Sequence, residues 1–156
     1  MKTKWKTLAA CIAIPLAVGA VASLLTGGRV SSFEIMNKPP LAPPGWLFPA
    51  VWTILYVLMG VASYLVLQSQ KPWEQVQSAL NVYALQLVFN FFWTLIFFGL
   101  GWYLFAFIWL ITLWILILIT LLCFFSINKF AGILLIPYLI WVTFAGYLNL
   151  GIALLN

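Results

Sequence analysis

The stretch NKPPLAPPGWLFPAVWTILY, residues 37–56, places a proline-rich segment directly before a long apolar run. Four of its first eight residues are prolines, which fix their own φ angle and disfavour helix in their neighbours. After Trp46 the chain stays apolar to about Leu67, and a membrane-crossing helix needs about 20 such residues. The stretch therefore predicts a stiff loop joined to a transmembrane helix. Pro49 falls near the start of that helix, where a missing N–H is tolerated.

The composition of the chain indicates that lipid is its main solvent. Of its 156 residues, 66% are hydrophobic and only 6% are charged, whereas soluble domains carry about a quarter charged residues. The net charge of +5 has no basic patch of soluble structure to carry it, so we expect no nucleic-acid partner. The chain has no histidine, and its two cysteines lie in apolar runs, so we expect no metal site of the usual Cys/His spacing.

Five apolar runs without an internal charge predict an all-α integral membrane protein. The expected spans are residues 8–25, 46–67, 76–98, 102–125 and 130–154, with a long loop at 26–45. Strands of a membrane barrel would be shorter and would alternate apolar with polar residues. We therefore expect one domain over residues 1–156, built as a bundle of five transmembrane helices. For the first run, a cleaved signal peptide ending near AVAS at 20–23 is the alternative, but the run continues to Leu25.

The distribution of basic residues predicts the orientation of the bundle. With the N-terminus inside, the inner side holds Lys2, Lys4, Lys6, Lys71 and Lys129, and the outer side holds Arg29 and Lys38. Lysine and arginine gather on the cytoplasmic side of membrane spans. We expect a cytoplasmic N-terminus, with the long loop on the outer side of a bacterial cell membrane.

Aromatic and polar residues of three spans are predicted to meet in the half of the membrane that contains the long loop. At 1.5 Å per residue, Trp52 lies roughly 9 Å below the start of its span and Asn90 roughly 12 Å before the end of its own. The residues that share these faces are Trp52, Tyr56, Gln86, Asn90, Trp93, Tyr138, Trp141, Ala145 and Asn149. Such a set predicts a pocket for a large, flat, apolar ligand. The alternative for the amides is hydrogen bonding between helices.

Three motifs in order resemble the TspO/MBR family of tryptophan-rich sensory proteins and translocator proteins. They are KPPLAPPGWLFPAVWTILY (38–56), FNFFWTLIFF (89–98) and IPYLIWVTFAGYLN (136–149). The resemblance covers essentially the whole chain and points to a bacterial member. It implies a five-helix bundle, commonly a homodimer, that binds porphyrins such as protoporphyrin IX and haem in a pocket under the first loop. The pocket residues that it implies are Trp52, Tyr56, Asn90, Trp93, Trp141 and Ala145.

The expected lid of this pocket is the first loop, and it departs from the family. Its candidate residues are Phe33, Pro39, Pro40, Leu41, Pro43, Pro44 and Trp46. Many relatives carry Trp-Tyr where this chain has Ser32 and Phe33, and a tryptophan where it has Leu41. The sterol motif of animal relatives needs a cation shortly after a tyrosine near the C-terminus, and none follows Tyr147.

The function that these features favour is a sensor-like membrane receptor for porphyrins or similar flat apolar molecules, with no required cofactor. The chain has no histidine, and no acidic residue lies inside a span, so we expect no hydrolase active site. Enzyme activity stays open for one reaction, light-dependent porphyrin breakdown, with Trp52 and Trp141 as candidate electron donors. Two alternatives are passive transport of tetrapyrroles or lipids and a scaffold for partner helices.

Overall fold

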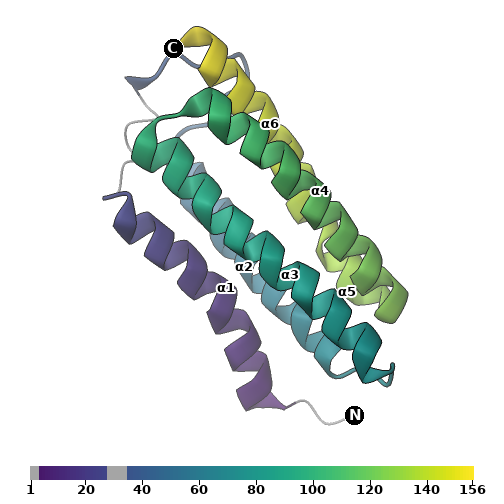
Figure 1. The fold of residues 1–156 in the computed structure, drawn as a ribbon. Coiled ribbons are helices and arrows are strands. Elements are labelled where there is room, and N and C mark those ends of the chain that lie inside the picture. The colour runs from purple at the N-terminus through teal and green to yellow at the C-terminus, as the bar shows by residue number, and fades with distance from the viewer. Residues whose placement is uncertain (1–3, 28–34) are drawn as a thin grey trace.

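The computed structural model describes residues 4–27 and 35–156, and in these ranges the chain is a bundle of membrane-length helices (Figure 1). The helices are α1 (Trp5–Leu25), α2 (Leu47–Leu67), α3 (Trp73–Thr94), the π-helix η2 (Leu95–Leu100), α4 (Tyr103–Ile127), α5 (Lys129–Leu134) and α6 (Ile136–Leu155). Because η2 continues α3 and α6 continues α5, they make five candidate spans. The predicted all-α membrane fold is confirmed, with span ends within about three residues of those expected.

The fifth span is broken near its start, whereas the sequence predicted one continuous helix. Leu135 separates α5 from α6, and its N–H donates to the carbonyl of Gly132, three residues back, at 3.1 Å. Pro137 explains the break, because it lacks an N–H for the preceding turn and its ring clashes with a regular helix there. The Asn128 side chain starts α5 by accepting bonds from the N–H groups of Phe130 and Ala131.

The third span runs further than expected, because its last turn changes from α to π geometry. The expected end of this span was residue 98, whereas η2 extends the helix to Leu100. Gly101 ends it in the left-handed conformation, with a φ of 68° that favours glycine. Phe97 and Phe98 lie in this π-helical turn, in the loop-side half of the bundle.

Neighbouring spans pack in an order that leaves space on the loop side. Helix α4 lies against both α3 and α6, and α1 lies along one edge of the bundle against α2 (Figure 1). Helix α2 packs closely on α5, but its backbone does not approach α6 in the same way. The bundle is therefore closed around α5 and wider between α2 and α6, toward the first loop.

The closest backbone approach that glycine permits lies between α1 and α2. A Cβ on Gly60 would overlap the backbone of Ile12 and come within 2.7 Å of the Cys11 carbonyl oxygen. Pro15, in the interior of α1, supplies no N–H to that carbonyl. The first half of α1 is thus held against α2 by a contact that only glycine allows.

Replacing Gly60 with alanine should loosen this contact. We expect Gly60→Ala to lower the free energy of unfolding in detergent by about 1–3 kcal/mol, because the backbones must move apart. Gly146→Ala is the matched control, since its new methyl group would meet only Leu110 Cδ2 at 3.6 Å, an ordinary contact. If the two variants were equally stable in thermal unfolding, the close backbone contact at Gly60 would not stabilise the bundle as proposed.

Candidate functional site

A hydrogen-bonded bridge centred on Asn90 joins three helices in the bundle interior. The Tyr56 hydroxyl of α2 donates to Asn90 Oδ1 at 2.8 Å, and Asn90 Nδ2 donates to the Tyr138 hydroxyl of α6 at 2.9 Å. Tyr138 in turn donates to Gln86 Oε1 at 2.6 Å. Asn90, Gln86 and Tyr138 are each only 1% exposed. These contacts satisfy the costly buried amide of Asn90, so we call them the Asn90 bridge.

A second polar contact ties the third and fifth spans nearer the loop. Trp93 Nε1 donates to Asn149 Oδ1 at 3.0 Å, and Asn149 Nδ2 donates to the backbone carbonyl of Tyr103 at 2.8 Å. Asn149 is 1% exposed, and both ends of its amide are used. The Trp93 ring is thereby held in a fixed orientation in the bundle interior.

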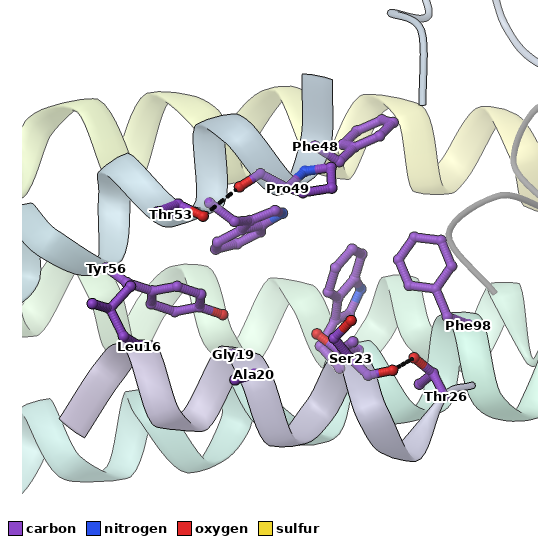
Figure 2. A pocket seen from close by; sticks show the side chains of 13 residues that line it. Leu16, Gly19, Ala20, Ser23, Thr26, Phe48, Pro49, Thr53, Tyr56 and Phe98 are labelled. Atoms are coloured by element: carbon purple, nitrogen blue, oxygen red, sulfur yellow. Dashed lines mark hydrogen bonds between the residues drawn. The ribbon is translucent and has the colours of Figure 1, made fainter. Parts of the chain in front are cut away.

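A cavity of about 430 Å³, here called the front cavity, lies between α1, α2 and α3 on the loop side of the Asn90 bridge (Figure 2). Its walls are Leu16, Gly19, Ala20, Ser23 and Thr26 of α1, Phe48, Pro49, Trp52, Thr53 and Tyr56 of α2, and Trp93, Thr94 and Phe98 of the third span. The volume is in the range of small-molecule sites. Among these described residues none is charged, so the cavity suits an apolar ligand.

Trp52 is the central ring of this cavity. It stacks on Tyr56 with ring centroids 5.6 Å apart, and it lies 6.4 Å from Trp93 at a tilted angle. Its edge also meets Tyr138 at 6.1 Å. Several aromatic faces at similar depth, one of them anchored through Asn149, form a surface that favours a flat aromatic ligand.

A smaller cavity of about 20 Å³, the rear cavity, lies behind the same rings toward α6. Four residues line both cavities and separate them, namely Phe48, Trp52, Trp93 and Phe98. The rear wall adds Phe97, Trp141, Ala145, Leu148, Asn149 and Ile152. The buried Nε1 of Trp141 has no hydrogen-bond partner in the described part of the chain.

The described part of the first loop is fastened to α6. The Tyr147 hydroxyl donates to the Pro40 carbonyl at 2.6 Å, and the Asn156 Nδ2 donates to the Asn37 carbonyl at 2.8 Å. The Pro39 ring packs on Gly151, where a Cβ would come within 2.6 Å of it. None of the described lid candidates lines the front or the rear cavity.

The predicted lid residues differ in their burial and in their contacts. Pro39 is buried against α6, whereas Leu41 and Trp46 are 85% and 70% exposed. Pro40 is held through its carbonyl, and Pro43 and Pro44 lead into α2. Phe33 lies outside the described residues. The loop residues that the structure places line neither cavity, and their role as a lid over a ligand stays a prediction.

The structure brings the predicted pocket residues together in two layers. Trp52, Tyr56 and Trp93 line the front cavity, while Trp141, Ala145 and Asn149 line the rear cavity. Gln86, Asn90 and Tyr138 line neither cavity and form the Asn90 bridge, which agrees with the alternative of hydrogen bonding between helices. Direct contact of these three residues with a ligand stays a prediction.

Sequence reasoning missed the contribution of α1. Gly19 and Ser23, with Leu16 and Thr26, form one wall of the front cavity. Their spacing of three and four residues puts them on one helix face, and this was the available signal. Phe48 and Phe98 were missed as well, because nothing in an apolar run distinguishes a cavity wall from a lipid-facing surface.

Comparisons with known proteins bear on this arrangement. The sequence model of the TspO/MBR family matches residues 11–155. The chain belongs to the TspO/MBR family. It is 42% identical over 151 residues to the tryptophan-rich protein TspO of Chlorobaculum tepidum, with 96% of each chain covered. It is 40% identical to the tryptophan-rich sensory protein of Cereibacter sphaeroides, covering 80% of this chain and 76% of that one.

The similarity extends to animal proteins. The translocator protein of Bos taurus is 33% identical over 121 residues, covering 75% of this chain and 70% of that protein. This TspO/MBR family member is accordingly a multi-pass membrane protein of the sensor and translocator type. The residues that line its two aromatic cavities lie within residues 11–155, which the family model matches.

Removing the amide of the Asn90 bridge should destabilise the bundle. In Asn90→Leu the Tyr56 hydroxyl loses its acceptor inside the protein, so we expect the free energy of unfolding to fall by about 1–3 kcal/mol. Asn81→Leu is the control, because Asn81 is exposed on the same helix. The two variants are compared by unfolding in mixed micelles. A scaffold that does not need the bridge would show no difference between them.

Proposed function

We propose that this TspO/MBR family member binds a porphyrin, such as protoporphyrin IX or haem, in the front cavity. The observation that carries the proposal is the uncharged slot lined by the rings of Phe48, Trp52, Trp93 and Phe98. A tetrapyrrole is flat and aromatic, so it gains both apolar burial and ring contacts from such walls. Binding in this slot is what a sensor or receptor of tetrapyrroles requires.

The polar residues of the cavity fit the ends of such a ligand. Ser23 and Thr26 lie in the last turn of α1 and just beyond it, nearest to the membrane surface, where the acid groups of a porphyrin remain hydrated. On the rear-cavity side of the four shared rings, Trp141 offers a buried N–H donor. A buried donor without a partner costs free energy, and a ligand acceptor that reached it would remove that cost.

The two cavities also suit a ligand larger than either. The front cavity has about 430 Å³ and the rear cavity about 20 Å³, and the four shared rings are all that divides them. A turn of the Phe48 or Phe98 ring would join the two spaces. The site would then extend from α1 to Trp141.

Titration with protoporphyrin IX tests this proposal. We expect saturable quenching of tryptophan fluorescence, and Trp52→Phe should weaken binding about three- to tenfold because the central aromatic surface shrinks. Trp73→Phe is the control, since Trp73 is exposed at the start of α3 and lines neither cavity. Absence of saturable binding to the wild-type protein would refute the proposal.

Illumination of the complex tests the catalytic extension. A photoexcited porphyrin that accepts an electron from Trp52 or Trp141 is reduced while the indole is oxidised. Porphyrin loss should then slow in the double variant Trp52→Phe/Trp141→Phe at equal occupancy. Loss at the wild-type rate in that variant would remove these two residues from the reaction and leave binding as the function.

A further inference from the structure

The front cavity opens sideways between α1 and α2. Ala20 and Ser23 of α1, with Pro49 and Thr53 of α2, line the cavity and are also exposed at the protein surface. Figure 2 shows the two pairs on opposite sides of the space. The opening is edged by small or short side chains, so no large ring closes it.

The depth of this opening places it in the hydrocarbon layer. Ala20 lies five residues before the end of α1 and Thr53 six residues after the start of α2. At 1.5 Å per residue these positions are about 8 and 9 Å from the helix ends. Each helix has 21 residues and matches the roughly 30 Å of a bilayer core. The opening therefore faces acyl chains.

Helix α1, which forms one side of the opening, has the smallest buried share of the five spans in the described chain. Only 11% of the α1 window is buried, against 33–44% for the other four spans. Its first half is held at Gly60, where the Cys11 carbonyl meets α2. Pro15 follows this contact and interrupts the hydrogen bonding of the helix, so it lies between the contact at Gly60 and the cavity-lining residues, of which Gly19 packs against the Tyr56 ring.

The described part of the first loop is held in place on the opposite side of the bundle from α1. Hydrogen bonds from Tyr147 to Pro40 and between Asn37 and Asn156 hold the loop on α6. The Pro39 ring also packs directly against Gly151. Entry between α1 and α2 breaks none of these contacts.

We propose that the ligand enters the front cavity from the bilayer, through the opening between α1 and α2, as residues 16–25 swing about Pro15. The proposal rests on the binding function proposed above and narrows its ligand class. The ligand must dissolve in lipid before it binds, and it enters with an uncharged edge leading. Its concentration in the membrane, and not in water, then sets the rate of association.

A reversible lock across the opening tests the route. In a Cys11→Ser/Cys123→Ser background, Ala20→Cys and Thr53→Cys are joined by a short, cleavable bifunctional thiol reagent after reconstitution into vesicles. We expect association of protoporphyrin IX to slow about tenfold or more, and release of porphyrin loaded before locking to slow equally. Cleavage of the reagent should restore both rates. If association slowed but release did not, the reagent would be filling the cavity and not blocking the opening, and the proposal would be overturned.

The matched control locks the loop instead. Pro40→Cys and Tyr147→Cys, joined by the same reagent in the same background, fasten the loop where Tyr147 already meets Pro40. We expect both rates to stay at the unlocked value. Slowing by the loop lock to the same extent as by the α1–α2 lock, or by the loop lock alone, would refute entry from the bilayer.

A test without porphyrin separates this proposal from the proposed function. Thr94→Cys, in the same background, places one thiol in the wall of the front cavity. An uncharged, lipid-soluble maleimide should label it at least tenfold faster than a charged, water-soluble maleimide. Equal labelling by the charged reagent would overturn lateral entry even if porphyrin binds, and the expected pattern would support it even if porphyrin does not bind.

Discussion

The hydrogen bonding of one asparagine amide is the constraint on which the rest of this bundle depends. Lipid offers no partner for a buried amide and little apolar driving force for helix association. Asn90 therefore has to find its partners on other helices, and it finds them in Tyr56 and Tyr138. This links α2, α3 and α6 at a single level and fixes the rotation of each about its own axis.

The cavities follow from that bridge. At and below its level α2 packs against α5, while on the loop side the backbones of α2 and α6 stand apart. The space between them is occupied by large rings, with Trp52 at the centre and Trp93 fixed through Asn149. These large rings cannot pack perfectly against each other, and the front and rear cavities are the space left between them. The aromatic site is therefore the incompletely filled part of the bundle core.

Much of this arrangement is predictable from the sequence, since it depends on apolar length and helical spacing. The five spans follow from uncharged runs, and the shared depth of Trp52, Asn90 and Asn149 follows from counting residues along them. The separation of the polar residues into bridge and wall does not follow, because it depends on helix rotation. The docking of Pro39 on Gly151 also depends on tertiary contacts between distant segments. The role of α1 was hidden because small residues suit both close packing and an open wall.

The π-helix η2 has a consequence for how this chain should be compared with others. A π turn places one more residue in the helix than an α turn would, so the faces before and after Leu95 are out of phase. A single helical wheel drawn through the third span would put Phe97 and Phe98 on the wrong sides. Their positions become intelligible only when the span is treated as two helices joined end to end. The extra residue of the π turn lets both rings reach the rear cavity.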